Sequence, residues 1–314
     1  MSERRLSSHD SFDPGLTQQY GGRLRRSINK DGSFNVRRTG TRWQDKNLYS
    51  LLVQAPWHKF LGMVLTAYLV VNLVFASLFY LIGVSHLQGA DVSTPGRAFL
   101  NAFFFSTQTL TTVGYGAIAP ADTATNALAS LEALLGLMGF AVATGLLVGR
   151  VSRPSARIAF SDKMLVSPYE GGTSLQFRIA NQRSNSLMEM EANVMLMTVD
   201  AAAQGLKRDY AVLRLERSNV HFFPLTWTIV HPIDSRSPLW QKTAEDLEQL
   251  QAEILILIKG YDETFSQTVH ARYSYRFDEL QWGASFAPAF NVDEQGDMVL
   301  HMDRVSAVKE PESR

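Results

Sequence analysis

The chain has 314 residues, of which 46% are hydrophobic, with 30 basic and 30 acidic side chains and no cysteine. The balanced charge excludes a global attraction to nucleic acid, and the lack of cysteine excludes disulfides and thiolate metal sites. The length suffices for two ordinary domains, and the hydrophobic residues are concentrated in a few segments of the chain.

Residues 1–42 are rich in serine, glycine and arginine, which predicts a disordered cytoplasmic N-terminus. The next segment, 43–56, has an apolar helical stripe between Asp45, a predicted N-cap, and Pro56, which ends the helix. A short amphipathic helix directly before a membrane span is expected to lie in the interface, parallel to the bilayer.

Two long segments lack charged side chains almost completely. Residues 60–83 have none, and residues 123–149 have only Glu132. At 1.5 Å per residue each segment is long enough to cross a hydrocarbon core of about 30 Å. We therefore predict transmembrane helices at about 58–84 and 123–150, and their length and composition disfavour two buried helices of a soluble protein.

The charges on either side of these spans predict their orientation. Eleven Lys and Arg residues precede residue 60, whereas the stretch 84–122 has only Arg97. Because cytoplasmic loops carry the excess of Lys and Arg, both termini are expected in the cytoplasm. The chain is then a multi-pass protein of the cell (inner) membrane, with a pore domain at 57–152.

The apolar segment 96–110 is too short to span a membrane, which predicts a re-entrant pore helix. It leads into TTVGYG, residues 111–116. A pore that carries a dehydrated cation must replace its water with protein oxygens. Successive carbonyls face one side when left- and right-handed backbone alternate, and glycine adopts the left-handed form at little cost. Gly114 and Gly116 therefore predict a K⁺ selectivity filter.

The predicted K⁺ ligands are backbone carbonyls of the filter, with one hydroxyl. The filter residues are Thr112, Val113, Gly114, Tyr115 and Gly116. One loop cannot surround an ion, so a ring of copies is expected, most simply four. The predicted function is passive K⁺ conduction, with K⁺ as the permeant ion, no organic cofactor and no enzymatic activity. The alternative is a non-conducting, membrane-anchored β-domain that senses or binds, which leaves the filter loop unexplained.

The second span suggests where the pore closes. A cavity and gate are predicted from residues that recur every four positions, Gly136, Phe140, Thr144 and Val148. Glycines in this span are equally expected to allow bending or close helix packing. Glu132 is not expected to face lipid, because a charged side chain at the bilayer centre costs about 2.5–3.5 kcal/mol. It either attracts cations or hydrogen-bonds behind the filter.

After Pro154 the pattern changes to the period-two alternation of strands. This alternation predicts strands at 174–179, 188–194, 212–218 and 265–277, and a continuous apolar run predicts a buried strand at 253–259. Thr243 with Asp246 predicts the capped start of a helix over 243–250. These elements predict a cytoplasmic all-β sandwich over 153–300, followed by a C-terminal tail at 301–314. His221, His231 and His270 form no metal-binding motif, and no metal is expected besides K⁺ in the filter.

Four stretches resemble the inward-rectifier potassium channels, most closely their bacterial (KirBac-type) branch: TTVGYG, TGLLVGRVSRPSARI, FPLTWTIVHPIDSRSPLW and GYDETFSQTVHARYSYRFDELQWG. The resemblance covers about residues 43 to 290. It implies a homotetramer, a slide helix at 43–56 and an immunoglobulin-like cytoplasmic β-sandwich. It also implies gating at the inner end of the second helix and by the cytoplasmic domain, with modulation by anionic lipids or phosphoinositides.

The resemblance also assigns roles to charged residues. Candidates for lipid headgroup contacts are Lys59, Arg150, Arg153 and Arg157, although positive-inside anchoring explains the arginines equally. Glu189 and Glu263 match acids of the family's cytoplasmic pore, where they would concentrate cations; as plain surface acids they would have no special role.

Two departures from the family pattern lie in the pore. Phe140 stands where many relatives carry Asp or Asn, and an apolar ring does not attract cationic blockers such as Mg²⁺ or polyamines, so weak rectification is expected. Ba²⁺ is expected to block the pore.

The second departure is Gln108, which stands where relatives carry a pore-helix Glu. Together with Glu132, Gln108 is a predicted support of the filter.

Overall fold

The structure is a computed structural model that describes residues 14–16, 19–20, 26–40, 48–152, 156–200 and 206–309. The chain divides into two compact units. One unit is Arg38–Arg153, and the other combines Met1–Arg37 with Pro154–Arg314. The predicted N-cap Asp45 lies outside the described residues.

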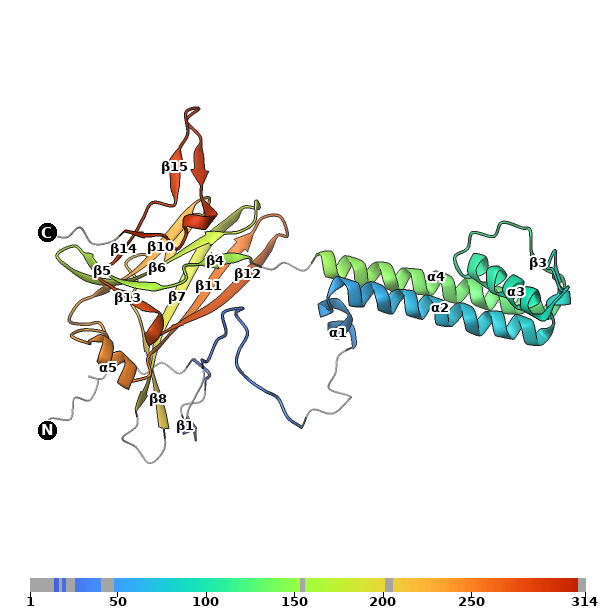
Figure 1. The fold of residues 1–314 in the computed structure, drawn as a ribbon, viewed down its shortest axis with the longest axis horizontal. Helices are drawn as coiled ribbons and strands as arrows, with labels where there is room; N and C mark the ends of the chain where they lie inside the picture. Colours follow the sequence, from blue (N-terminus) through green and yellow to red (C-terminus); the bar gives the residue numbers. More distant parts are fainter. Residues whose placement is uncertain are drawn as a thin grey trace. The chain divides into compact units, whose positions relative to one another are not determined.

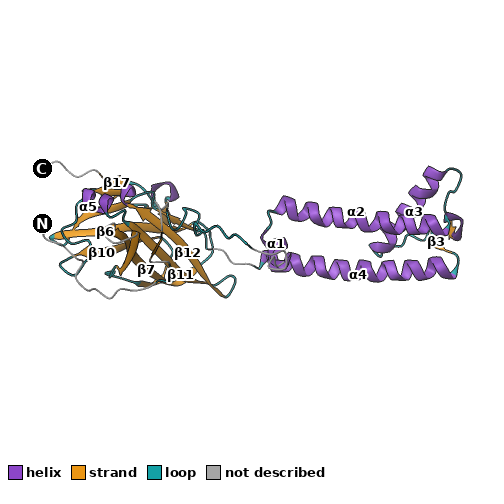
Figure 2. Ribbon diagram, turned by 90° about the horizontal axis from the view of Figure 1, so that it is seen from below, coloured by secondary structure: helices purple, strands orange, loops and turns teal. Residues whose placement is uncertain are grey.

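The first unit is helical. Its elements are α1 (Leu48–Gln54), α2 (Trp57–Ile82), a 3-10 turn (Val84–His86), β2 (Leu87–Gln88), α3 (Pro95–Leu110), β3 (Ala119–Pro120) and α4 (Thr123–Val151). Figures 1 and 2 both show α2 and α4 side by side, with α3 beside one end of the pair. β2 pairs with β3 and joins the loops at that end.

Local sequence sets where these helices begin. Pro56 directly precedes α2. At the start of α3, the Thr94 side chain accepts a hydrogen bond from the Arg97 N–H, and the first helical residue is proline. Asp122 caps α4 in a reciprocal capping box with Thr125. These residues at the helix starts therefore make α2, α3 and α4 three separate helices.

The two long helices are too exposed to be the core of a soluble protein. Only 22% of the most apolar window of α2 and 6% of that of α4 is buried within the chain. A helix of a soluble protein buries its apolar stripe. Here the buried apolar side chains cluster where α2 meets α3, with the Phe79 and Phe105 rings edge to face at 4.9 Å between centroids. The remaining apolar surface of α2 and α4 fits a membrane, as predicted.

The second unit is a β-sandwich (Figure 2). One sheet has the order β1-β8-β7-β11-β12, with β9 on β7, and the other has the order β10-β6-β5-β13, with β4 on β6. The strands are β1 (Gln19–Tyr20), β4 (Ile158–Phe160), β5 (Met164–Tyr169), β6 (Gly172–Asn181), β7 (Leu187–Asp200), β8 (Leu206–Val212), β9 (Asn219–Phe222), β10 (Thr226–Ile233), β11 (Glu253–Asp262), β12 (Gln267–Arg276) and β13 (Leu280–Trp282). Buried side chains from both sheets, including Phe177 and Ile254, form one core. The predicted two-layer sandwich is confirmed.

One predicted strand is wrong. Residues 213–218 lie between β8 and β9 and are not part of a ladder. The Leu213 N–H donates to the Val194 carbonyl in one sheet, and the Glu216 N–H donates to the Val230 carbonyl in the other. The segment therefore crosses between the sheets, and its alternating burial comes from extended backbone without strand pairing.

Part of the predicted disordered N-terminus is folded. Ile28 is only 5% exposed. The backbone N–H of Ser27 donates to both Glu253 carboxylate oxygens at 2.9 Å, and the Ile28 N–H donates to one of them at 3.4 Å. The prediction of disorder over 1–42 is wrong for residues 26–36, because composition reports local tendency and these residues are held by partners far along the chain.

A cluster of charges strengthens this contact. Arg26 and Lys30 both pair with Glu279, Lys30 Nζ at 2.7 Å. The Lys30 ammonium also lies over the Tyr273 ring, 4.4 Å from its centroid. Burial disfavours the charged form of Glu279, but hydrogen bonds from Lys30 and the Arg276 N–H, with the nearby positive charges, outweigh burial and lower the pKa of its carboxyl.

The end of the chain belongs to the same unit. β14 (Ser285–Phe286) pairs with β17 (Val308–Lys309), and β15 (Phe290–Val292) pairs with β16 (Met298–Leu300). Val305 is 3% exposed. The predicted start of a tail at 301 is therefore wrong, since the chain stays folded through Lys309; residues 310–314 lie outside the described residues. The remaining elements are α5 (Ala244–Gln249) and the 3-10 turns at Phe277–Glu279 and Met302–Arg304.

Candidate ion-conduction site

The loop after α3 has a backbone of alternating handedness. The φ angle is positive at Thr112 (58°), Gly114 (52°) and Gly116 (81°). The residues between them, Val113 and Tyr115, have ordinary negative φ. Alternation of this kind turns successive carbonyls toward one side, which is what the filter prediction requires. The sequence predicted left-handed backbone at the two glycines but did not predict it at Thr112, since this conformation is costly for a β-branched residue.

Gln108, near the end of α3, bonds to this loop from behind. Its carbonyl accepts hydrogen bonds from the N–H groups of Val113 (2.9 Å) and Gly114 (3.2 Å), and its side-chain Oε1 accepts one from the Tyr115 N–H (3.2 Å). In a trans peptide the N–H and the preceding C=O point in opposite directions, and every described peptide bond is trans. The carbonyls of Thr112, Val113 and Gly114 therefore face away from Gln108.

The residues that carry this row of oxygens are not covered by other parts of the same chain. Residues 111–116 are all exposed, Tyr115 by 83%. Backbone carbonyls that leave their own helix require water, an ion or another chain as a partner. Aligned neutral oxygens that carry partial negative charge suit a cation that has lost its water.

Glu132 lies behind the same helix. It is 0% exposed, and its Oε1 is hydrogen-bonded to Ser106 Oγ of α3. Ser106 Oγ also lies 3.1 Å from Asn72 Oδ1 of α2. Of the two alternatives for Glu132, hydrogen bonding behind the filter agrees with this geometry, whereas attraction of cations from an exposed position does not.

The predicted cavity face of α4 divides into two parts. A Cβ on Gly136 would lie 2.0 Å from the Leu110 carbonyl oxygen, so this glycine lets α4 touch the end of α3. Phe140, Thr144 and Val148 instead share an exposed face, with Phe140 74% and Val148 57% exposed. Gly136 is thus a packing contact within the chain, and the other three residues are free to line a cavity.

Arg150 was predicted to face lipid headgroups, but the structure gives it partners within the chain. Its guanidinium donates hydrogen bonds to the carbonyls of Leu52 (2.6 Å) and Ala55 (2.7 Å). It also lies over the rings of Trp57 and Phe60, 4.8 and 4.5 Å from their centroids. These carbonyls end α1, where a helix leaves its acceptors unsatisfied and favours a cation. Arg150 is therefore a cap of α1, which corrects the prediction.

The other basic candidates are on the surface where they are described. Lys59 lies in the first turn of α2 and Arg157 directly precedes β4, and both are exposed. Arg153 lies outside the described residues. Lys59 and Arg157 therefore keep the exposure that a lipid contact needs.

The two predicted acids of the cytoplasmic pore lie at one end of adjacent strands. Glu189 in β7 is exposed and has a positive φ of 49°, beside a register shift in its pairing with β11. Glu263 directly follows β11, is exposed, and donates its N–H to the Ser186 carbonyl at 3.4 Å. A bulge re-aims a side chain at a strained position, which is typical of functional sites.

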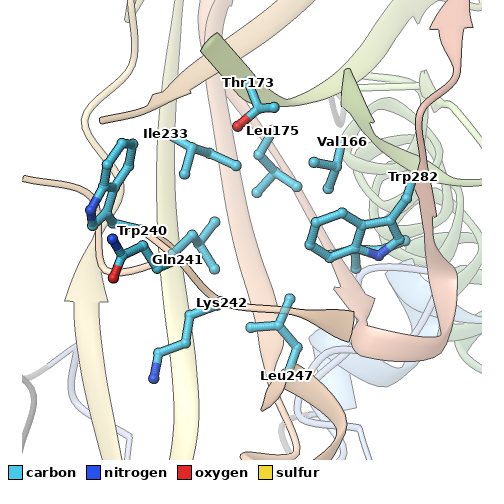
Figure 3. A pocket seen from close by; sticks show the side chains of 11 residues that line it. Val166, Thr173, Leu175, Ile233, Trp240, Gln241, Lys242, Leu247 and Trp282 are labelled. Atoms are coloured by element: carbon cyan, nitrogen blue, oxygen red, sulfur yellow. The ribbon is translucent and has the colours of Figure 1, made fainter. Parts of the chain in front are cut away.

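The β-sandwich also contains a hollow (Figure 3). Its volume is about 240 Å³, and Trp240 and Trp282 stand on opposite sides of it, with Lys242 at the edge. The rest of the lining is apolar apart from Thr173 and Gln241. This lining contains no Asp, Glu, His or Cys side chain.

The histidines of this domain provide no metal site among the described residues, where no three metal-ligating side chains gather. His231 is buried, with Nδ1 2.6 Å from the Arg214 carbonyl and Nε2 2.7 Å from Ser237 Oγ. Burial lowers the pKa of its imidazole. Its role is therefore structural.

Comparison with known proteins decides the family. Residues 63–153 match the ion channel family, and residues 158–313 match the inward rectifier potassium channel C-terminal domain. The inward rectifier potassium channel Kirbac3.1 of Paramagnetospirillum magnetotacticum is 37% identical over 285 residues, which cover 89% of this chain and 94% of that protein. The chain belongs to the inward-rectifier potassium channel family.

Animal members of the family are also similar. The G protein-activated inward rectifier potassium channel 3 of Homo sapiens is 30% identical over 90% of this chain and 78% of its own length. The corresponding channel 2 of Mus musculus is 26% identical over 87% of this chain and 69% of its own length. The channel is thus a membrane protein of a K⁺-conducting family, not an enzyme, and each of its two units contains one of the two matched regions.

Proposed function

We propose that four copies of this channel form a homotetramer that conducts K⁺ passively through residues 112–116. The observation that carries the proposal is the row of carbonyls at Thr112, Val113 and Gly114, which face away from Gln108 and are exposed within one chain. Four such rows around one axis replace the water around a K⁺ ion. Gln108 then sets their position, because three filter N–H groups bond to it.

The gate is proposed at the inner half of α4. Phe140, Thr144 and Val148 line the cavity, and a ring of four Val148 side chains closes it by excluding water. Because Phe140 is apolar, block by Mg²⁺ or polyamines at that position is weak. Glu189 and Glu263 concentrate cations at the cytoplasmic entrance, and movement of the β-domain acts on the gate.

Lipid modulation is proposed through the basic residues that remain exposed. Lys59 and Arg157, with Arg153, contact anionic or phosphoinositide headgroups at the cytoplasmic face of the inner membrane. Both termini lie on that side. Arg150 influences lipid binding only through the position of α1.

A flux assay tests the central proposal. Full-length protein in liposomes is expected to take up Rb⁺, to exclude Na⁺ and to be blocked by Ba²⁺. Gly116→Ala is expected to abolish uptake, because φ is 81° there, whereas Gly62→Ala in α2, where a Cβ meets nothing within 4 Å, is a matched control that keeps it. Equal passage of Na⁺ and Rb⁺ would refute selectivity. An assembled protein without any flux would favour the alternative, a non-conducting β-domain sensor.

A further inference from the structure

Three polar side chains meet in the apolar interior of the helical unit, one each from α2, α3 and α4. Asn72, Ser106 and Glu132 are each 0% exposed within a single chain. Ser106 Oγ lies 3.1 Å from Asn72 Oδ1 and 3.2 Å from the Asn72 carbonyl oxygen, and it is hydrogen-bonded to Glu132 Oε1. We call these three residues the buried triad.

The hydrogens available to the buried triad can be counted. The Asn72 amide donates to the Tyr68 carbonyl at 2.8 Å, which leaves its Oδ1 to face Ser106. The Ser106 hydroxyl has one hydrogen, but three acceptor oxygens surround it. An ionised Glu132 only accepts, so Ser106 would donate to it and leave Asn72 Oδ1 without a donor. A protonated Glu132 donates to Ser106, and Ser106 then donates to Asn72.

The surroundings offer an ionised Glu132 no compensation. Its Oε2 has no hydrogen-bond partner in the part of the chain that the structure describes. The titratable or charged side chains of the two helices packed against it are His58, Lys59, Tyr68, Tyr80 and Arg97. None of these is hydrogen-bonded or ion-paired to Glu132 among the described residues. A buried, unpaired carboxylate is far more costly than the neutral acid.

We infer that Glu132 is a neutral carboxylic acid that donates to Ser106, and that the chain of hydrogen bonds from Glu132 through Ser106 to Asn72 fixes α3 against both spans. Ser106 lies two residues before Gln108, which bonds to the filter loop. Glu132 is thus a positioning residue for the filter from inside each subunit. Its effect on conduction rests on the proposed filter, whereas its protonation does not.

Infrared spectroscopy of the full-length channel in lipid vesicles tests the protonation. At neutral pH we expect a protonated-carboxyl band that disappears in Glu132→Gln. The band should shift in Ser106→Ala, which removes its hydrogen-bond partner, and stay unchanged in Ser130→Ala, whose hydroxyl bonds to Asn126 in its own helix at 2.8 Å. The inference would be overturned if Glu132→Gln removed an ionised-carboxylate band and left the protonated-carboxyl band unchanged.

Rb⁺ uptake tests the positioning role. Glu132→Gln keeps a donor for Ser106 in a side chain of similar volume, so its flux and selectivity should match the wild type. Glu132→Leu leaves Asn72 and Ser106 one donor short, and we expect about a tenfold lower flux per tetramer. Wild-type flux in Glu132→Leu, or lost flux in an assembled Glu132→Gln, would refute the role. Absence of flux in the wild type would instead count against the proposed function, while the infrared band would remain interpretable.

Discussion

Replacing Arg150 should release α1 from the C-terminal end of α4. α1 has seven residues, and a helix this short is not stable by itself in water. The carbonyls of Leu52 and Val53 in its last turn, and that of Ala55 directly after it, accept hydrogen bonds from the two terminal nitrogens of the Arg150 guanidinium. We therefore expect Arg150→Ala to unfold or detach α1 while α4 itself remains helical.

The size of this effect follows from the contacts. A hydrogen bond to a charged group contributes about 1.5–3 kcal/mol, and a cation over an aromatic ring adds about 0.5–2 kcal/mol. The three bonds share one guanidinium and are not additive, and water partly replaces them in the variant. We expect a loss of about 3 kcal/mol, which corresponds to roughly a hundredfold increase in the population of detached α1.

Hydrogen–deuterium exchange of residues 48–55 in liposomes measures this population. Arg150→Lys is the decisive control, because it keeps the charge that a lipid contact requires but lacks the planar fork that reaches several carbonyls. We expect both variants to exchange much faster than the wild type. The reasoning would be refuted if Arg150→Lys behaved like the wild type while Arg150→Ala did not, since a charge alone would then suffice.

Three further predictions concern the pore and the β-domain. Gly136→Ala should lower the thermal stability of the purified channel by about 1–3 kcal/mol, because its Cβ would lie 2.0 Å from the Leu110 carbonyl oxygen; Gly139→Ala, with nothing within 4 Å in the chain, is the control, and equal effects would contradict the contact. Phe140→Asp should strengthen voltage-dependent block by polyamines, measured in planar bilayers, and unchanged block would refute the argument on weak rectification. Burial lowers the pKa of His231, so its stabilising effect is complete above the ordinary value of 6.5 and is lost as the pH falls below it. The temperature at which half of the protein is unfolded should therefore fall less on acidification in His231→Gln than in the wild type. Equal falls in the two proteins would contradict this prediction.

The elements that sequence predicted well are those set by local chemistry. Two long segments almost without charged side chains predicted two membrane spans, and the structure has α2 and α4 at these positions. Thr243 and Asp246 form the capping box predicted for α5. Alternation predicted β6, β7 and β12, because half-buried strands need a period of two, and a continuous apolar run predicted the buried strand β11. The same alternation failed at 213–218, because it reports an extended backbone and does not report which neighbour that backbone pairs with.

The contacts that sequence missed join residues far apart in the chain. Residues 26–36 have a composition typical of disorder, yet they pack against a carboxylate at Glu253 and a charge cluster at Glu279. Arg150 has the position and charge of a lipid contact, and only its distance to three carbonyls shows that it caps α1. Neither group of contacts produces a periodic or compositional pattern in the sequence, so neither could be predicted from it.

Within one chain the N-terminal and C-terminal parts of α4 are restrained very differently. The N-terminal part meets α3 twice, through Glu132 and Ser106 and through Gly136 at the Leu110 carbonyl. The C-terminal part has an exposed face at 140–148, and beyond that face Arg150 bonds to α1. The proposed filter, which must keep its oxygens at fixed spacing, benefits from the first arrangement, and the proposed gate, which must move, benefits from the second. We therefore expect gating motion to begin beyond Gly136, with α1 displaced together with the end of α4.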